Sequence, residues 1–356
     1  MLITFSILFL FSTLFLLLAR YIAIKVGLVD KPNKRKRHYG LVPLVGGISI
    51  YISLYFYLFF YWYELVQSDV YLICAGILVI TGVLDDRFDI SVKLRVLIQA
   101  CVALVMMFVA GLYIHSLGYI FGPWEIRLDY IGYLVTLLAV WAAINAFNMV
   151  DGIDGLLGGL SCVSFGALGI LLALDGQPQL ATFCFAVIVT ILPYILFNLG
   201  ILGKRFKVFM GDAGSTLIGF TIIWIILQSS QGSGHPMNPV TALWVIAIPL
   251  MDMIATMYRR ISKGKSPFSA DRQHIHHIMM RSGFSAKETF VLITLIAALL
   301  ASVGILGEHL SFVNEWMMFI LFLCAFMLYG YCLKRAWRVA RFLKRLRRRY
   351  RPKYLS

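Results

Sequence analysis

The sequence predicts an all-α polytopic integral membrane protein with about eleven transmembrane helices in one bundle. Of its 356 residues, 60% are hydrophobic and only 14% are charged, whereas soluble domains carry about 25% charged residues. Many separate apolar stretches approach the ~20 residues that a helix needs to cross a bilayer. Lys and Arg fall almost entirely in alternate connections between these stretches. Regular strand alternation is absent, which argues against a membrane barrel.

Eleven apolar segments are expected to span the membrane. They are 2–22, 44–63, 70–84, 94–118, 130–147, 156–174, 180–199, 214–230, 239–258, 288–307 and 312–333. No basic region precedes the first segment and basic residues follow it, so we expect a retained helix and not a cleaved signal peptide. The six cysteines form no CxxC pair and are typical of small packing residues.

The distribution of basic residues predicts the orientation of the chain. Of the 32 Lys and Arg residues, 31 fall on one side of the expected membrane and only Arg127 falls on the other. Because positive residues favour the cytoplasmic side, the N-terminus is predicted to be periplasmic and the C-terminus cytoplasmic. The net charge of +15 then reflects membrane topology, and no nucleic-acid partner is expected.

Two parts of unequal size are predicted. Residues 1–333 form a single transmembrane catalytic domain, and residues 334–356 form a basic cytoplasmic tail. Aromatic and leucine residues interrupt the charges of this tail, so it could lie along anionic headgroups as an amphipathic helix. A plain positive anchor explains the tail equally well.

Four clusters of polar residues fall on the predicted cytoplasmic side, and the first ends the third apolar segment. Asp85 and Asp86 are adjacent, and Lys93 and Arg95 follow shortly after. Adjacent carboxylates repel each other, so they need a metal, a basic partner or water. The cluster suits a site for a metal and a phosphate, although a solvated helix end that carries acids is an equal alternative.

The second cluster places a polar residue at every third position: Asn145, Asn148, Asp151 and Asp154. On a helix this spacing brings the four side chains near one another. Hard divalent cations prefer such oxygen donors. Glycines beside them would allow a ligand to approach the backbone closely. A polar interface between helices is the alternative.

The third and fourth clusters add one isolated acid and a group of histidines. Asp212 lies between Gly211 and Gly214, just before an apolar segment, where a helix N-terminus would favour a phosphate oxygen. Asp212 could equally cap that helix, and both roles are compatible. The fourth cluster lies in the most basic loop and comprises Asp271, Arg272, His274, His276 and His277. These histidines favour substrate phosphates, with help from Arg260, over a zinc site.

Because all four clusters are predicted on one face, they are expected to form one site. Carboxylates suited to Mg²⁺, bases suited to phosphate and a lipid environment indicate chemistry on a phosphorylated lipid with a phosphorylated soluble donor. A transporter or flippase for an anionic lipid or sugar phosphate is the alternative, and an intramembrane Asp252 would suit it. The outer face lacks a matching polar cluster, and no internal repeat is visible.

The motifs resemble those of the polyprenyl-phosphate N-acetylhexosamine-1-phosphate transferases. The matching residues are Asp85-Asp86, Asn148-Met-Val-Asp151-Gly-Ile-Asp154-Gly, Phe209-Met-Gly-Asp212-Ala-Gly-Ser, His274-Ile-His-His and the N-terminal Pro43-Leu-Val-Gly-Gly47. The chain looks most similar to the branch that uses N-acetylglucosamine. The resemblance implies UDP-N-acetylglucosamine as donor, undecaprenyl phosphate as acceptor, UMP as a product, and Mg²⁺ or Mn²⁺ as cofactor. It places the reaction at the first membrane step of O-antigen or enterobacterial common antigen synthesis.

The resemblance also implies roles for individual residues. Asp212, followed by Asn148, would bind the metal ion. Asp85, Asp86 and Lys93 would lie near the attacking phosphate, and Asp154 near the uracil. His274 would be a further catalytic residue, near the diphosphate or sugar. The other substrate-binding residues would be Asn145, Asp151, Phe209, Arg260, Arg272, His276 and His277. The expected location is the bacterial inner membrane with the active site on the cytoplasmic face. The need for a base at Asp85 or Asp86 and the presence of a homodimer stay open.

Overall fold

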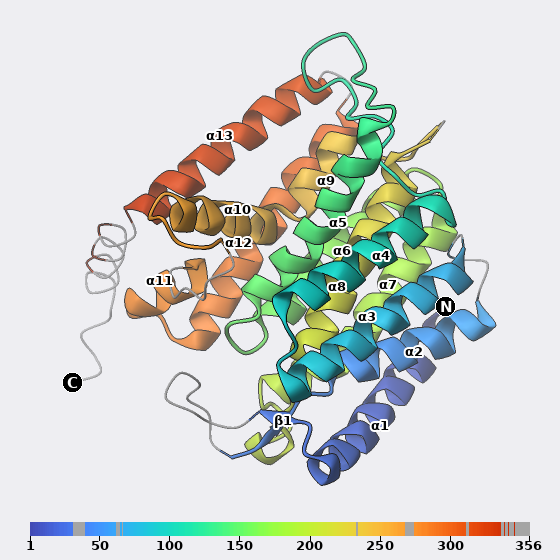
Figure 1. Cartoon of the computed structure of the whole chain (residues 1–356), viewed down its shortest axis with the longest axis vertical. Coiled ribbons are helices and arrows are strands. Elements are labelled where there is room, and N and C mark those ends of the chain that lie inside the picture. Colours follow the sequence, from blue (N-terminus) through green and yellow to red (C-terminus); the bar gives the residue numbers. More distant parts are fainter. Residues whose placement is uncertain are drawn as a thin grey trace.

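The computed structural model describes residues 1–30, 40–61, 65, 67–232, 234–267, 274–310, 313–335, 338, 341 and 345. Within these residues the chain is mainly helical (Figure 1). The elements are α1 (Leu2–Val26), β1 (Val29–Asp30), β2 (Val42–Pro43), α2 (Gly46–Phe60), α3 (Ser68–Phe88), α4 (Val92–Phe108), α5 (Ile131–Val150), α6 (Leu156–Leu174), α7 (Pro178–Asn198), a 3₁₀ turn η2 (Lys204–Phe206), α8 (Gly211–Ser230), α9 (Pro239–Val245), α10 (Ala247–Ile261), α11 (Ile275–Arg281), α12 (Ala286–His309) and α13 (Glu315–Lys334).

The helices confirm a polytopic membrane protein. Among the described residues, eight helices are long and apolar enough to cross a membrane, and a ninth span results if α9 and α10 count as one. The shorter helix α2 is also apolar. Each of the eleven predicted segments overlaps a helix, whereas the number of spans and the orientation of the termini stay predictions. Most of the predicted basic tail lies outside the described residues.

The predicted fourth segment, 94–118, was too long. Helix α4 ends at Phe108, and Gly111 adopts the left-handed conformation, with φ of 69°. A glycine in this conformation is a common way to end a helix, because it has no Cβ to clash with the backbone. The apolar residues that follow, such as Ile114, belong to a connection. The Ile114 amide donates to the Thr136 hydroxyl at 2.8 Å.

The predicted ninth segment, 239–258, is broken. Helices α9 and α10 meet at Ile246 with a bend of 83°. Pro249 has no backbone N–H, so it cannot donate to the Val245 carbonyl as a helix would require. The Ser164 hydroxyl donates to that carbonyl instead, at 2.9 Å. The bend turns α10 sideways at the edge of the bundle, beside α13 and α11 (Figure 1), and Arg260 in its last turn lies near the polar clusters.

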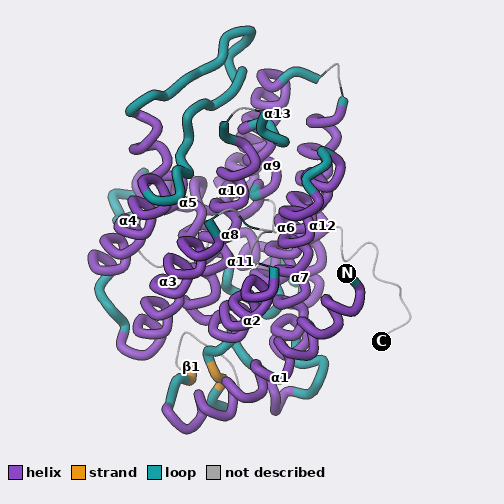
Figure 2. The backbone as a smooth tube through the Cα atoms, turned by 90° about the vertical axis from the view of Figure 1, so that its right-hand side faces the viewer, coloured by secondary structure: helices purple, strands orange, loops and turns teal. Residues whose placement is uncertain are grey.

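Helix α8 forms the centre of the bundle, and nearly all of its residues are buried. It packs against α2, α3, α5 and α6, which surround it in Figure 2. Two glycines allow close approach to its first turn. A Cβ on Gly82 would lie 2.3 Å from the Ala213 backbone, and one on Gly47 would lie 2.2 Å from the Gly214 backbone. These contacts seat the beginning of α8, with Asp212, against the end of α3.

Candidate active site

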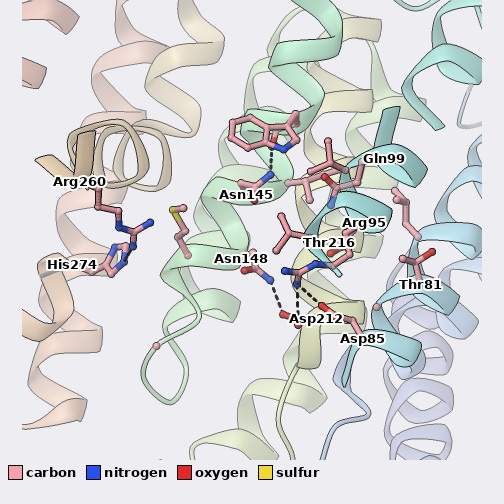
Figure 3. A pocket seen from close by; sticks show the side chains of 18 of the residues that line it. Thr81, Asp85, Arg95, Gln99, Asn145, Asn148, Asp212, Thr216, Arg260 and His274 are labelled. Carbon is pink, nitrogen blue, oxygen red and sulfur yellow. Dashed lines mark hydrogen bonds and ion pairs between the residues drawn. The ribbon is translucent and has the colours of Figure 1, made fainter. Parts of the chain in front are cut away.

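A cavity of about 300 Å³ lies where α3, α4, α5, α8, α10 and α11 meet. Figure 3 shows its two sides, with Asn148 of α5 between them. We call one side the acidic wall; it consists of Asp85, Arg95, Asn148 and Asp212. The other side, the histidine wall, consists of Arg260, His274, His276 and His277. The cavity therefore joins residues of all four predicted clusters, which lie up to 192 positions apart in the chain.

One arginine bridges the carboxylates of the acidic wall. The Arg95 guanidinium forms an ion pair with Asp85 and lies 3.9 Å from the nearer oxygen of Asp212. The Asp85 side chain is only 3% exposed, whereas that of Asp212 is 38% exposed. Asp85 is thus held inside the wall by its pair with Arg95, while Asp212 presents oxygen to the cavity.

Asp86 positions Asp212 from behind. Its carboxylate accepts the Asp212 backbone N–H at 3.1 Å, and it is absent from the cavity lining. A Cβ on Gly211 would lie 2.4 Å from the other Asp86 oxygen, so glycine is needed for this contact. The alternative that Asp212 caps α8 was wrong, because the N-cap residue is Met210 and Asp212 lies in the first turn. The Asp86 carboxylate, from α3, accepts a backbone N–H of the first turn instead.

Asn148 extends the acidic wall toward α5. Its amide nitrogen donates to Asp212 at 2.7 Å and to the Ser215 hydroxyl at 2.9 Å. In this rotamer the Asn148 nitrogen faces Asp212, whereas a metal ligand must offer oxygen. To share a metal ion with Asp212, as predicted, Asn148 would have to turn its amide by half a revolution so that the oxygen faces Asp212.

The carboxylates of this wall are suited to a divalent cation. One oxygen each of Asp85 and Asp86 is buried without a hydrogen-bond partner among the described residues, and Asp212 is partly exposed to the cavity. The described residues contain no group of three or more His, Cys, Asp or Glu side chains arranged to hold a metal ion. Mg²⁺ needs only one or two carboxylates, because it keeps several waters and is completed by substrate phosphates.

A chain of polar contacts holds the histidine wall. His274 Nδ1 donates to Asp252 at 2.6 Å, and the other Asp252 oxygen accepts the Tyr329 hydroxyl at 2.6 Å and the Ile275 amide at 3.1 Å. With Nδ1 bound to the carboxylate, His274 directs Nε2 toward Arg260, whose guanidinium lies 3.5 Å away. The buried Asp252 thus positions His274, and it links the membrane helices to the loop that carries the histidines.

His276 is buried in the same wall. The side chain is 1% exposed, and neither ring nitrogen has a hydrogen-bond partner among the described residues. Its ring lies parallel to that of His274 with centroids 5.7 Å apart. Burial, and then the nearby His277, lower the pKa of His276 to about 3. A Cβ on Gly152 would lie 2.2 Å from its Nε2, so a glycine after α5 makes room for this ring.

The predicted row of four polar residues on one helix was wrong beyond its first half. Helix α5 ends at Val150, so Asn145 and Asn148 are helical and line the cavity, whereas Asp151 and Asp154 follow in the connection to α6. The chain leaves the helix just before Gly152, where His276 occupies the space of a side chain. Asp154 instead pairs with Lys207 at 2.6 Å.

Three further predicted residues lie outside the cavity or outside the described structure. Lys93 is exposed on α4 and does not line the cavity. Phe209 holds the loop before α8, since its carbonyl accepts the Gly46 amide at 3.0 Å, and the Lys207 amine lies 5.2 Å from its ring centroid. Arg272 lies outside the described residues. Substrate roles for these residues, and for Asp151 and Asp154, stay predictions.

Sequence reasoning missed two residues that build the site. Arg95 was seen beside Lys93 without a role, although residues two apart on a helix point in nearly opposite directions, so only one of them can face Asp85. Both lie near the start of the same helix, so the sequence offers no means to choose between them. Tyr329 was missed entirely, because a tyrosine in an apolar segment resembles an ordinary interfacial aromatic residue.

Comparison with known proteins identifies the family of this chain. Residues 68–230 match the model of glycosyl transferase family 4. The chain is 68% identical over 343 residues to the undecaprenyl-phosphate alpha-N-acetylglucosaminyl 1-phosphate transferase of Yersinia pestis and 67% identical to that of Escherichia coli strain K12, with 96% of this chain and 94% of each relative covered. The Pasteurella multocida protein of the same name is 56% identical, with 98% of both chains covered. The chain therefore belongs to the undecaprenyl-phosphate alpha-N-acetylglucosaminyl 1-phosphate transferase family.

Proposed function

We propose that this protein transfers N-acetylglucosamine-1-phosphate from UDP-N-acetylglucosamine to undecaprenyl phosphate. The products are undecaprenyl-diphospho-N-acetylglucosamine and UMP. The names of the relatives support the acceptor and the transferred group. The observation that carries the proposal is the cavity itself, where Arg95 and the carboxylates face Arg260 and His274. All reported relatives are named as transferases, so a transporter is not proposed.

The reaction needs positioning more than proton transfer. An oxygen of the lipid phosphate attacks the β-phosphorus of the donor, and the bond from this phosphorus to the bridging oxygen of UMP breaks. A phosphomonoester has a second pKa of about 6, so the acceptor is largely dianionic at neutral pH. Arg95 is placed to bind that charge, and Arg260 with His274 to bind the donor diphosphate. Fixed charges at both phosphates supply the stabilisation that phosphoryl transfer requires.

A divalent cation, Mg²⁺ or Mn²⁺, is part of this proposal. Asp212 would hold it, with Asn148 after rotation of its amide, and it would supply positive charge to the phosphate oxygens. The buried Asp85 oxygen without a hydrogen-bond partner among the described residues, at the cavity lining, supports this assignment. Asp86 would keep Asp212 in place through the bond to its amide.

An apolar cavity supports a lipid acceptor. A space of about 320 Å³ between α4 and α5 is lined by Val96, Gln99, Ala100, Leu137, Leu138 and Trp141. It shares Val96, Gln99 and Trp141 with the candidate site. A polyprenyl chain in this space would place its phosphate beside Arg95, on the same helix α4. We therefore propose that the acceptor enters from the lipid between α4 and α5.

The proposed location is the bacterial inner membrane with the site on the cytoplasmic face, where UDP-sugars are made. The distribution of Lys and Arg supports this orientation. A cysteine placed in the 34–37 loop should be shielded from an impermeant reagent in intact cells, and one placed in the 231–238 loop should be labelled. Labelling of the 34–37 loop from outside would overturn the orientation.

Release of UMP by the purified protein tests the function directly. In detergent with Mg²⁺, the protein should release UMP from UDP-N-acetylglucosamine only when undecaprenyl phosphate is present. A panel of UDP-sugars tests the donor, and N-acetylglucosamine should give the largest kcat/KM. Absence of UMP release with a folded protein, or equal rates without the acceptor, would refute the proposed reaction.

A further inference from the structure

A second cavity lies behind the histidine wall. Its volume is about 790 Å³, and it is formed by α10, α11 and α13. Figure 1 shows these three helices at one edge of the molecule, with α10 between α13 and α11. Arg260 of α10 lines the candidate active site, whereas its neighbour Arg259 lines this second cavity. The same two elements, α10 and α11, therefore separate the two cavities.

The body of this cavity is apolar and exposed at the surface of the bundle. Ile254 and Tyr258 on α10 are 40% and 59% exposed, and Met327 on α13 is 65% exposed. Gly330 of α13 forms part of the lining, and a Cβ added there would meet no atom within 4 Å. The space beside Gly330 is thus open. An acyl chain bound in this space would cover Ile254, Tyr258 and Met327.

One end of the cavity is strongly basic. Arg259, Lys263, Arg281 and Lys334 line it, and none of its described lining residues is Asp or Glu. The Lys334 amine lies 5.3 Å from the Tyr258 ring centroid, so it joins α13 to α10 at this end. Cations near a helix C-terminus interact favourably with the helix dipole. That interaction does not explain why the cations of three helices line one concave space.

We propose that this second cavity binds an anionic phospholipid, with its phosphate among Lys263, Arg281 and Lys334 and an acyl chain beside Gly330. The apolar body and basic end match the two parts of such a lipid, and each Lys or Arg near an anionic lipid surface strengthens binding. The basic end coincides with the ends of α10 and α13, where a spanning helix leaves the hydrocarbon. The bound lipid would steady α10 and α11 and so support Arg260 and His274 from behind.

Binding can be measured by native mass spectrometry of the purified full-length protein during titration with phosphatidylglycerol. Phosphatidylcholine with the same acyl chains isolates the effect of headgroup charge. The variant Lys263→Gln/Arg281→Gln/Lys334→Gln removes three cations from the cavity. The matched control, Lys25→Gln/Lys204→Gln/Lys287→Gln, removes three exposed cations elsewhere. We expect wild type and control to bind phosphatidylglycerol equally, and the cavity variant to bind it roughly a hundred-fold more weakly.

A second variant separates the cavity from its charge. Gly330→Phe fills the open space beside the acyl chain and keeps all four cations, so it should also weaken binding, by about ten-fold. Phosphatidylglycerol should raise the rate of UMP release by wild type and control, but not by either cavity variant. Equal affinity of wild type and the three-cation variant would refute the site. If Gly330→Phe bound phosphatidylglycerol as tightly as wild type, binding would depend on surface charge alone. That result would overturn the proposed acyl-chain site. Preferential binding of undecaprenyl phosphate there would identify a second acceptor site instead.

Discussion

The two walls of the candidate active site are held in place by different means. The residues of the acidic wall lie on α3, α4, α5 and α8. Beside them, Gly82 and Gly47 bring backbones into direct contact with α8. The histidine wall stands on the end of a bent helix and a short helix, α10 and α11, at the edge. Packing fixes the first wall, and a few hydrogen bonds to Asp252 fix the second.

From this difference we expect the two walls to have different roles in the reaction. Chemistry requires reacting groups to be held closely in place, and the acidic wall offers that rigidity. A donor that must enter and leave needs a wall that can adjust slightly. Changes to the acidic wall should therefore lower kcat, whereas changes to the histidine wall should mainly raise KM for the donor.

The largest effect is expected at Asp212. Asp212→Asn keeps the shape of the side chain but removes the charge that would hold a divalent cation. Loss of this cation should lower the rate by on the order of a thousand-fold, and added Mg²⁺ should no longer stimulate UMP release. Asp175→Asn, at an exposed position after α6, serves as the control for loss of an aspartate. Near-normal activity in a folded Asp212→Asn protein would exclude the metal role.

Asp85 tests whether the acidic wall acts on the rate. Asp85→Asn leaves Arg95 without its charged partner, which displaces the arginine from the acceptor phosphate. We expect kcat to fall by on the order of a hundred-fold, with donor affinity unchanged by calorimetry in the absence of acceptor. Asp89→Asn is a matched control, because Asp89 is exposed just beyond the same helix. Loss of donor binding with a normal rate at saturation would reverse the roles of the two walls.

Asp252 tests the histidine wall without touching substrate. Asp252→Asn removes the carboxylate that orients His274, and we expect KM for the donor to rise by roughly ten-fold with a smaller change in kcat. Tyr329→Phe removes only one of the hydrogen bonds to Asp252 and should raise KM about five-fold. Tyr55→Phe, exposed on α2, controls for loss of a hydroxyl. If kcat and thermal stability fell while KM stayed unchanged, Asp252 would have a purely structural role.

The smallest expected effect concerns stability against pH. In the folded protein His276 has a pKa of about 3, below its ordinary value of 6.5. Below pH 6.5 the unfolded chain takes up a proton that the folded chain does not, so stability is fully present above pH 6.5 and falls as the pH drops toward 3. Thermal unfolding in detergent should show a weaker pH dependence for His276→Gln than for wild type. His309→Gln, at an exposed position, should follow wild type; identical slopes in all three would contradict the assignment.

The sequence predicted the acidic wall more completely than the histidine wall. Local motifs give Asp85, Asn148 and Asp212 directly, and their positions at the ends of apolar segments bring them to one level of the bundle. The choice between Lys93 and Arg95 depends on the phase of α4 relative to α3, which no local pattern contains. The space beside Gly152, just after α5 ends at Val150, is likewise occupied by a distant residue, His276.

The histidine wall depends on contacts that only tertiary structure can reveal. Asp252 was recognised as an unusual acid within a membrane segment, but its partner His274 lies 22 residues away, beyond a helix end. In the sequence, the residues around Ile246 resemble one uninterrupted apolar segment, because one proline does not always break a helix in a membrane. At the bend, the Val245 carbonyl accepts a hydrogen bond from Ser164 on a different helix, a partner that no local pattern reveals.

The bond from Tyr329 to Asp252 spans 77 residues and comes from the last described helix of the bundle. During synthesis every motif residue leaves the ribosome well before Tyr329 does. A chain that ended after α12 would contain both walls and all four clusters, yet His274 would rest on a carboxylate that lacks one of its donors. The histidine wall therefore gains its full set of described contacts only when α13 packs against α10.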